Sequence, residues 1–343
     1  MSRFRISSRP PAVAALPAFS LLALAFLALS SCGSSVGDLA GGGTGGTGIS
    51  TGVITGFGSV IMNGAHFQTD NAVAPGFQTK KIIKGKEDTS HASDQDLFSV
   101  GMVVTIRHSP NDKNAMEIEY EPNLEGPIES KDPDASIIVV LGQNVILDNA
   151  AFFASLGQDN VVEVSGFVDN TGRIRATYVE VKRPTGLGDE FEIKGYITGL
   201  SPSGNTFRLG PLPDESWSTV TVFAPSAVQD LPSGPVNGMY VQVKTADTRP
   251  VNGIITATNV QLFIARTDFP ENAKADIDGL VTKLGSSSGS ILSFDLEGKA
   301  VQADDSTLYT EGKTAADIQP NVRLQVQGKE IGGVLLASKI IFR

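Results

Sequence analysis

The sequence predicts an all-β protein: about four small closed barrels in tandem, placed after an export leader and a flexible tether. Two observations support this fold class. The chain is rich in Gly, Pro, Val, Ile and Thr, a composition that favours short strands and many turns over long helices. It also contains four copies of one pattern, each about 70 residues long.

Residues 1–31 have the features of a signal peptide. Arg3, Arg5 and Arg9 form a basic start without any acidic residue, and an apolar run from about Ala12 to Leu29 follows. The alternative is a transmembrane helix, which needs about 20 apolar residues. Pro17 leaves an apolar core of about a dozen residues, so we predict a cleaved signal.

The stretch Leu29-Ser30-Ser31-Cys32 resembles the bacterial lipobox. The resemblance implies that the signal is cut before Cys32 and that Cys32 carries the acyl chains. Two or three long acyl chains, such as palmitate, hold a protein on a membrane effectively permanently. Gly33 follows, where an Asp would imply inner-membrane retention in enteric bacteria. The resemblance therefore favours the outer membrane, on its periplasmic or surface face.

Residues 32–50 comprise the lipidated Cys and a Gly-rich tether. Gly/Ser chains behave as flexible coil, so we expect residues 33–50 to span about 20–25 Å. The glycines are not a phosphate-binding loop, because no GxGxxG follows a strand and no Gly-Lys-Ser/Thr is present.

The chain is acidic, with a net charge of −10. Removing residues 1–31 takes away three Arg and no acids, which leaves −10 − 3 = −13. Nucleic-acid binding depends mainly on Lys and Arg that neutralise phosphates. We therefore expect no nucleic-acid partner.

The four copies share three ordered features. Each opens with Gly-x-Ile/Val, at glycines 74, 69 and 84 residues apart. Each then has a late alternating strand and ends on Ala-x-x-Ile/Val-x-apolar. The spacing exceeds that of propeller blades and suits a small domain. The predicted domains are 51–121, 122–184, 191–266 and 273–343. The openings are Gly52-Val53-Ile54, Gly126-Pro127-Ile128, Gly195-Tyr196-Ile197 and Gly279-Leu280-Val281; the late strands 101–106, 159–164, 238–243 and 321–326; the endings 115–120, 176–181, 257–262 and 337–342.

Each copy predicts three strands, a short helical turn and a hairpin. The strands alternate apolar and polar residues, so one face is buried and the other wet. Asn-Gly and Gly-Gly pairs supply turns with positive φ, and Ser, Asn or Thr can cap the helical patches. This order matches five-stranded OB-like barrels, which often place a helix between strands three and four. We expect neighbouring barrels to touch, with residues 183–192 as the most plausible hinge. The turns are at 63–64, 170–172, 252–253 and 332–333; the helical patches at 93–100, 149–156, 226–231 and 314–319.

The chain also resembles the DUF5666 family. The stretches that carry the resemblance are 51–70, 139–149 and 161–181, in the first two copies. The third and fourth copies share only the late strands and the opening. The family consists of small OB-like repeats in exported, often lipid-anchored proteins, so the resemblance implies fold and compartment but no activity.

No residues form a convincing catalytic group. A hydrolytic triad would need a Ser and an acid beside His66, His91 or His108, and no GxSxG elbow occurs. Paired carboxylates can act as acid and base on sugars, and one strand carries Glu117, Glu119 and Glu121. Residues two apart on a half-buried strand share its solvent-exposed face, so the spacing needs no catalytic explanation. We therefore expect a non-enzyme without a cofactor.

An acidic insertion at residues 84–96 is a weak metal-site candidate. Carboxylates with one imidazole could hold a divalent ion, but the spacing fits no Ca²⁺ loop. A solvated loop that leads into a helix cap explains the same residues, and we favour it. The candidate ligands are Glu87, Asp88, His91, Asp94 and Asp96.

Aromatic residues early in copies one and three are weak ligand-binding candidates. OB barrels bind extended ligands across strands two and three, often by stacking on aromatic rings. The best of them is Trp217, although a core role for it is favoured. The candidates are Phe57, Phe67, Tyr196, Phe207 and Trp217.

From these features we expect a non-catalytic envelope lipoprotein. The leading expectation is a binding or adaptor module for a glycan or an envelope protein, because tethered repeats raise the effective concentration for a repetitive partner. The alternative is a structural spacer without a ligand, and an enzyme comes third. Exposed aromatics aligned in two copies would favour binding, and filled barrels in firm contact would favour a spacer.

Overall fold

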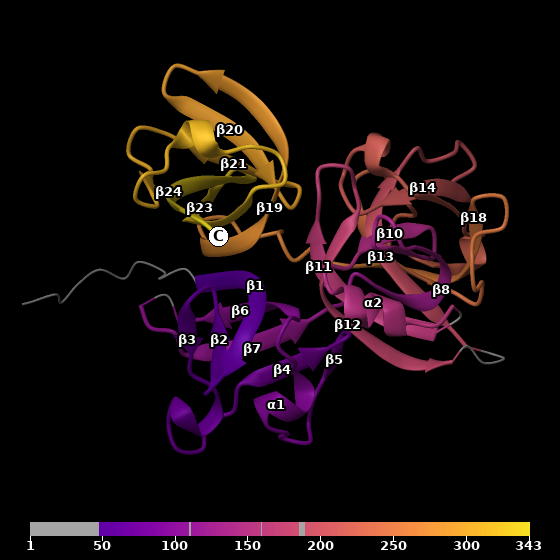
Figure 1. Ribbon diagram of the computed structural model, residues 1–343, viewed down its shortest axis with the longest axis horizontal. Helices are drawn as coiled ribbons and strands as arrows, with labels where there is room; N and C mark the ends of the chain where they lie inside the picture. The colour runs from indigo at the N-terminus through magenta and orange to yellow at the C-terminus, as the bar shows by residue number, and fades with distance from the viewer. Residues whose placement is uncertain (1–47, 110, 159, 185–188) are drawn as a thin grey trace, which may run out of the picture. The chain divides into compact units, whose positions relative to one another are not determined.

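The computed structural model describes residues 48–343 except 110, 159 and 185–188 (Figure 1). The predicted signal peptide, Cys32 and most of the tether lie outside the described residues. Within the described part the strands form four small barrels, which confirms the predicted fold class. No helix in this part of the chain has the length and apolar content needed to cross a membrane.

Barrel 1 is built from residues 48–120. Strand β1 pairs with β2 and β6, β2 pairs with β3, and β6 pairs with β7. A parallel bridge between Gln68 and Asn114 closes the ring between β3 and β7. The elements are β1 (Gly48–Phe57), β2 (Val60–Met62), β3 (Ala65–Phe67), η1 (Asp70–Ala72), β4 (Lys80–Ile83), β5 (Lys86–Glu87), α1 (Asp94–Leu97), β6 (Val103–His108) and β7 (Ala115–Tyr120).

Barrel 2 has the strand order of an OB-like barrel. The ring runs β8-β9-β10-β12-β11, and β11 returns to β8. Its third and fifth strands, β10 and β12, pair in parallel, and the other neighbours are antiparallel. The elements are β8 (Leu124–Asp132), β9 (Ile137–Val140), β10 (Gln143–Ile146), α2 (Ala150–Ser155), β11 (Asn160–Val168) and β12 (Ile174–Pro184).

Barrels 3 and 4 repeat this order, each with a parallel pair between its third and fifth strands. Barrel 3 consists of β13 (Phe191–Thr198), β14 (Thr206–Gly210), η2 (Glu215–Trp217), β15 (Val220–Phe223), η3 (Ser226–Val228), β16 (Gln229–Asp230), β17 (Tyr240–Thr245) and β18 (Ile254–Leu262). Barrel 4 consists of β19 (Lys274–Ser288), β20 (Ile291–Leu296), β21 (Lys299–Ala303), β22 (Leu308–Tyr309), η4 (Ala315–Asp317), β23 (Arg323–Ile331) and β24 (Val334–Phe342).

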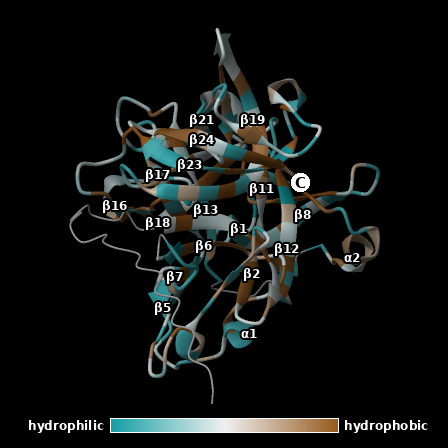
Figure 2. Cartoon of the chain, turned by 90° about the vertical axis from the view of Figure 1, so that its left-hand side faces the viewer, coloured by the Kyte–Doolittle hydropathy of each residue, from teal (hydrophilic) through white to brown (hydrophobic). Residues whose placement is uncertain are grey.

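Each barrel has a short helical turn before its fourth strand, as predicted. The Asn149 side chain caps α2 by accepting a hydrogen bond from the Phe152 N–H, and Ser93 and Thr314 start capping boxes at α1 and η4. In barrel 3 the cap position is Pro225, which makes no side-chain cap bond. Polar and apolar residues alternate along the strands, so each barrel encloses an apolar interior (Figure 2).

The glycine that opens a copy makes room for a turn. In barrel 1 a Cβ on Gly52 would lie 2.2 Å from Oδ1 of Asn63, and in barrel 4 a Cβ on Gly279 would lie 2.4 Å from Cγ of Glu297. Asn63 and Glu297 each begin the turn between strands two and three, with φ of 54° and 53°. A larger residue on the first strand would displace the turn side chain. The equivalent pair in barrel 2 is Gly126 and Leu141.

Strand β1 belongs to two barrels. Residues 48–51 pair with β6 of barrel 1 on one side and, in parallel, with residues 274–277 of β19 on the other. Ile49 therefore lies in the core of barrel 4, whereas Ile54, further along the same strand, lies in the core of barrel 1. The first and last copies are thus joined by one continuous sheet.

Barrels 2 and 3 also share a sheet and a core. Strand β8 pairs with β13 at Leu124 and Ile193, and one buried apolar cluster spans both barrels. The predicted hinge, residues 183–192, includes residues outside the described part, but its last two residues already belong to β13, which pairs with β8. A separate small cluster joins barrels 1, 2 and 4 through Val53, Val103, Phe167 and Leu280.

Candidate functional site

The predicted aromatic platform does not form on the barrel surfaces. Phe67 and Phe207 are fully buried, at 0% exposure, in the cores of barrels 1 and 3. Phe57 is half-buried against the core of barrel 1. Strand alternation turns these rings inward, so a ligand cannot stack on Phe67 or Phe207, which corrects the prediction for both residues.

Trp217 lies between two barrels. Its Nε1 donates a hydrogen bond of 3.0 Å to the carbonyl oxygen of Asn170 in barrel 2. Its ring packs against Gly172, where a Cβ would lie 3.1 Å from the indole. The predicted best platform is therefore part of a contact between barrels 2 and 3.

The four carboxylates of the acidic insertion have separate partners. Asp88 accepts hydrogen bonds from the N–H and hydroxyl of Ser90, and Asp96 caps α1 together with Ser93. Asp94 lies 3.0 Å from Nζ of Lys81. The remaining two candidate ligands are Glu87, 3.9 Å from Nζ of Lys80, and His91, which is exposed with φ of 57°. This is the predicted loop that leads into a helix cap, and no group of ligand residues in the described part is arranged for a metal ion.

Two of the histidines differ in environment. His66 is exposed on β3. His108 is buried: its Nδ1 lies 2.7 Å from the carbonyl oxygen of Ser109, and its Nε2 lies 3.0 Å from Oγ of Ser50. Burial lowers the pKa of His108. Ser50 is itself fully buried, so this pair cannot attack a substrate.

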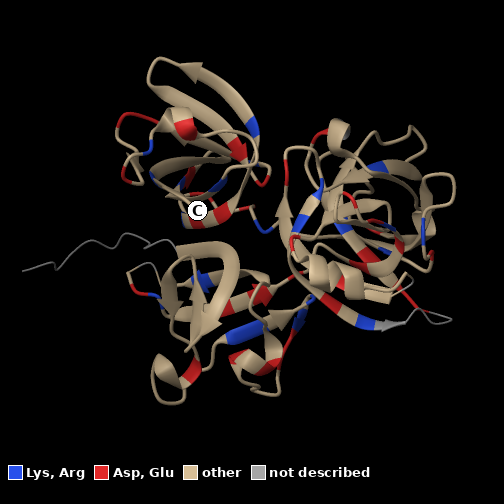
Figure 3. Ribbon diagram, viewed as in Figure 1, with Lys and Arg blue, Asp and Glu red and all other residues tan. Residues whose placement is uncertain are grey.

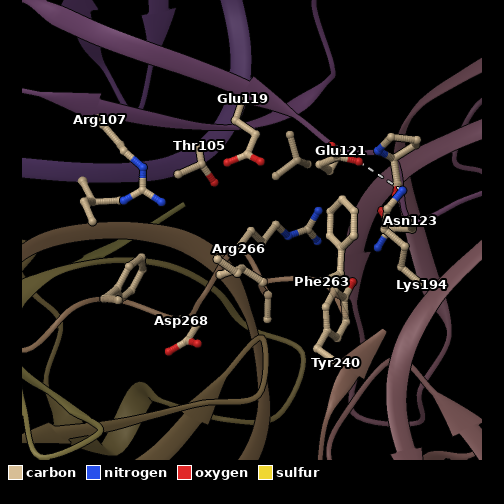
Figure 4. Close-up of a pocket in the computed structure, with 16 residues that line it drawn as sticks. Thr105, Arg107, Glu119, Glu121, Asn123, Lys194, Tyr240, Phe263, Arg266 and Asp268 are labelled. Atoms are coloured by element: carbon tan, nitrogen blue, oxygen red, sulfur yellow. Dashed lines mark hydrogen bonds and ion pairs between the residues drawn. The ribbon is translucent and has the colours of Figure 1, made fainter. Parts of the chain in front are cut away.

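An enclosed cavity lies at the junction of barrels 1 and 3 (Figure 4). Its volume is about 40 Å³, enough for one or two waters and far below the roughly 300–1,000 Å³ of a small-molecule site. Strands β6 and β7 supply polar groups from one side, and β13, β17 and the segment 263–269 from the other. The labelled polar and aromatic side chains of Figure 4 are Thr105, Arg107, Glu119, Glu121, Asn123, Lys194, Tyr240, Phe263, Arg266 and Asp268.

Lys194 is the buried cation of this junction. Its side chain is 1% exposed, and its Nζ lies 3.1 Å from both Glu121 and Glu192. The ammonium also lies 5.2 Å from the centre of the Phe263 ring. Burial raises the pKa of Glu121, and the charge of Lys194 opposes that rise. These contacts connect β13 of barrel 3 to the end of barrel 1.

Lys84 forms a second ionic link. It pairs with Glu125 in barrel 2, and its Nζ lies 3.5 Å from Glu163 and 3.9 Å from Glu192. The hydroxyl of Tyr120 donates to Glu163 at 2.9 Å. Burial lowers the pKa of Lys84, but the carboxylates more than offset this and the net shift is upward. The hairpin β4–β5 is thereby fastened to barrels 2 and 3.

Glu297 and Arg266 make the third link. The Glu297 carboxylate accepts hydrogen bonds from the N–H groups of Val168 and Leu280. Arg266 donates to the carbonyl oxygen of Gly166 at 2.6 Å and lies 3.5 Å from Glu297. Burial raises the pKa of Glu297 to about 7, and Arg266 opposes that rise. Acidic and basic residues occur on all four barrels (Figure 3).

Tyr196 is the one predicted aromatic beside this junction. Its ring packs edge-on against Tyr240, with the ring centres 4.8 Å apart. It lines a second small cavity, of about 30 Å³, with Arg266 and Glu297. Lys84, Lys194, Arg266 and Glu297 were not among the predicted site residues. Lys194 follows Glu192 at the next alternate position of one strand, as expected for an exposed face, and the other three lie outside the strands, so the local sequence carries no signal for the junction.

The larger hollows are open clefts. One, of about 620 Å³, lies between the hairpin β4–β5 and the outer face of barrel 3, and Gln242, Gln261, Lys244 and Phe263 are among its lining residues. Another, of about 540 Å³, lies over β1, β19 and β23. The enclosed junction thus joins barrels through paired charges, and room for a partner among the described residues lies in open clefts such as these two.

A family model matches two regions of the chain, residues 125–180 and 278–341. The family is DUF5666, a domain of unknown function. The two DUF5666 regions coincide with barrels 2 and 4, and the first contains the resemblance predicted at residues 139–149. Residues 51–70 lie outside both regions, whereas barrel 4, where the predicted resemblance was limited to the late strand and the opening, contains the second matched region. No curated protein is similar enough to this chain to count as a relative.

Proposed function

We propose that this chain is a non-catalytic structural module of the bacterial envelope, with four OB-like barrels joined into one body and carried on an acylated Cys32. The observation that carries the proposal is the sharing of β1, which pairs with β6 and β19 and places Ile49 in the core of barrel 4. Domains that each act as a separate binding unit need no such shared strand.

The filled barrels also support a structural role. The aromatic candidates are buried or lie in contacts between barrels, as with Phe67, Phe207 and Trp217. The junction cations are paired with carboxylates and backbone oxygens, and the cavity beside them has room only for water. An enzyme would need polar groups that converge in an enclosed pocket of substrate size. The hollows of that size in the described part of the chain are open clefts, so we place this class third.

A glycan-binding adaptor is the second candidate. The cleft of about 620 Å³ beside barrel 3 presents the amide of Gln261 and the ring of Phe263. The amide of Gln242 lies beneath them, is buried and donates to Glu192. The two amides are linked by a hydrogen bond of 2.6 Å, which fixes their orientation. Planar polar groups beside a ring can accept a sugar through hydrogen bonds and apolar contact.

The location is proposed from the sequence. The basic start, the apolar run and the lipobox-like stretch before Cys32 support export and acylation, and Gly33 supports the outer membrane. The proposed address is the periplasmic or surface face of that membrane. Cys32→Ser in the full chain should release the protein from the membrane fraction, and retention of the variant there would contradict the anchor.

A binding screen separates the two candidates. Residues 45–343 form one compact unit that contains every residue of the four cores, so this fragment keeps the folded body. We expect it to retain no glycan from an array of envelope glycans. A glycan retained by the fragment and lost in Gln261→Ala, but kept in the control Gln95→Ala on the surface of α1, would replace the structural proposal with the adaptor.

A further inference from the structure

A basic cleft lies where the first strand begins. Strands β6, β1, β19, β23 and β24 form one continuous sheet. The cleft of about 540 Å³ lies over this sheet, and Gly48, the first described residue, is one of the residues that line it. Three lysines line it: Lys113, Lys274 and Lys329.

The acidic side chain in the lining of this cleft is buried and hydrogen-bonded. Asp276 is the acidic residue among the described residues that line it. Its carboxylate is buried and accepts hydrogen bonds from the amides of Gln325 at 2.8 Å and Gln327 at 3.2 Å. The amide of Asn63 donates to it as well, at 3.2 Å. The amides do not cancel the charge of Asp276, which also acts on Lys113, but one carboxylate against three lysines leaves the lining with a net positive charge.

Two of the lysines repel each other. Lys274 on β19 lies directly opposite Lys329 on the antiparallel strand β23, and both are exposed. Like charges in this position destabilise a sheet. Within the described part of the chain neither lysine has an ion pair. Lys339 on β24 lies opposite Gln327 of β23 and adds a fourth cation. We call Lys113, Lys274, Lys329 and Lys339 the basic face.

The position of the basic face in the chain indicates its partner. Residues 33–47 connect Cys32 to Gly48, and their Gly-rich composition predicts a span of about 20 Å. If Cys32 is acylated, this span sets the typical distance of Gly48 from the membrane at about 20 Å. A cationic surface on an acidic chain, placed at the end of a short anchor, complements a negatively charged bilayer surface.

We propose that the basic face docks on anionic phospholipid headgroups of the membrane that holds the acylated Cys32. The lysine ammonium groups pair with headgroup phosphates, and the phosphates relieve the repulsion between Lys274 and Lys329. The acyl chains supply attachment, and the basic face sets which side of the body lies on the bilayer. The choice of membrane rests on the proposed function, whereas the affinity of the face for anionic lipid is independent of it.

Vesicle binding by the fragment 45–343, which lacks Cys32, tests the proposal. We expect the fragment to sediment with vesicles of phosphatidylcholine mixed with phosphatidylglycerol, and not with phosphatidylcholine alone. Binding should fall as salt is raised, because salt screens exposed charges. Each lysine near an anionic surface contributes about fivefold to the partition coefficient, so Lys274→Gln with Lys329→Gln should lower it about 25-fold.

Stability measurements exclude misfolding as the cause. Lys274→Glu converts the repulsive pair into an attractive one, so we expect it to raise the thermal midpoint while it weakens vesicle binding. Lys86→Gln with Lys283→Gln is the matched control, because it removes the same charge from exposed lysines that do not line this cleft. The control should bind like the parent.

Three results would overturn the proposal. Equal binding to neutral and anionic vesicles would exclude headgroup recognition. An unchanged partition coefficient in the double Lys→Gln variant would exclude the basic face. A fragment that dimerises, loses the dimer in Lys274→Glu and binds no vesicles would make this face an interface between copies. Each of these leaves the Cys32→Ser result and the glycan screen as they are, so the two proposals fail separately.

Discussion

Glu297 of barrel 4 accepts a hydrogen bond from the backbone N–H of Val168 in barrel 2, with its two oxygens 3.2 and 3.0 Å from that nitrogen. The same carboxylate accepts from the N–H of Leu280 on its own first strand. A single buried side chain thus joins two barrels through residues that are 129 positions apart in the sequence. The barrels are held together by such buried polar contacts as well as by shared strands.

The burial of Glu297 makes this contact dependent on pH. The pKa of the carboxyl rises from 4.5 to about 7 in the folded protein, so between these values the folded state holds a proton that the unfolded state has lost. The resulting stabilisation is complete below about pH 4.5 and is lost as the pH rises through 7. Its size is about 3 kcal/mol.

Glu297→Gln should remove this dependence. The Gln carbonyl oxygen can still accept from the N–H groups of Val168 and Leu280, and the amide does not titrate. We expect the loss of unfolding free energy between pH 5 and pH 8, measured with urea, to be about 3 kcal/mol smaller in the variant than in the parent. Equal losses in the two proteins would show that Glu297 is ionised throughout this range.

The sharing of β1 predicts that two similar substitutions on one strand weaken different barrels. Ile49→Ala should lower the unfolding free energy by about 2–5 kcal/mol through the core of barrel 4, and Ile54→Ala by a similar amount through barrel 1. Native-state hydrogen exchange resolves such local effects. Amides of β23 and β24 should exchange faster in Ile49→Ala, and amides of β2 and β3 in Ile54→Ala. Faster exchange of β2 and β3 in both variants would contradict a shared strand.

The buried charge of Lys194 predicts a large loss of stability on neutralisation. Lys194→Met leaves Glu121 and Glu192 without their common cation, and removing one partner of a buried pair destabilises a protein by about 3–5 kcal/mol. Chemical denaturation measures the loss. Adding Glu121→Gln to Lys194→Met should restore part of it, because one uncompensated carboxylate is removed. Lys86→Met on exposed β5 is the control and should change stability by under about 0.5 kcal/mol.

The repeat and the fold class could be predicted because their signals are local. Apolar alternation and the Gly-x-Ile/Val opening depend on residues that are close in sequence, and the caps at Asn149 and Thr314 depend on a single turn. The pairing of β1 with β19 could not be predicted. It joins parallel strands whose paired residues are 274 − 48 = 226 positions apart, and no local turn sequence predicts such a pair.

The junction residues were missed for a related reason. Strand alternation places Lys194 on the face of β13 that points away from the core of barrel 3. This face is buried because the end of barrel 1, with Glu121, packs against it. Phe67 and Phe207 pose the reverse difficulty. Alternation shows that each Phe lies on the same face of its strand as the residues two positions before and after it. It does not show which of the two faces points into the barrel.

The opening glycine predicts a sharp contrast between two positions of β1. Gly52→Ala places a Cβ 2.2 Å from Oδ1 of Asn63, whose amide bonds to the Thr51 carbonyl and to Asp276 of barrel 4. The turn must shift and both bonds weaken, so we expect a loss of about 1–3 kcal/mol in the free energy of unfolding.

Gly56→Ala is the matched control for that substitution. It adds the same methyl group to the same strand, and its nearest neighbour, Cδ1 of Ile61, would lie 3.4 Å away at the end of a flexible side chain. Urea denaturation should therefore separate the two variants by at least about 1 kcal/mol, with Gly56→Ala close to the parent. Only Gly52 lies against the turn residue Asn63. Equal losses in the two variants would therefore mean that glycine is required by the conformation of the strand and not by contact with the turn.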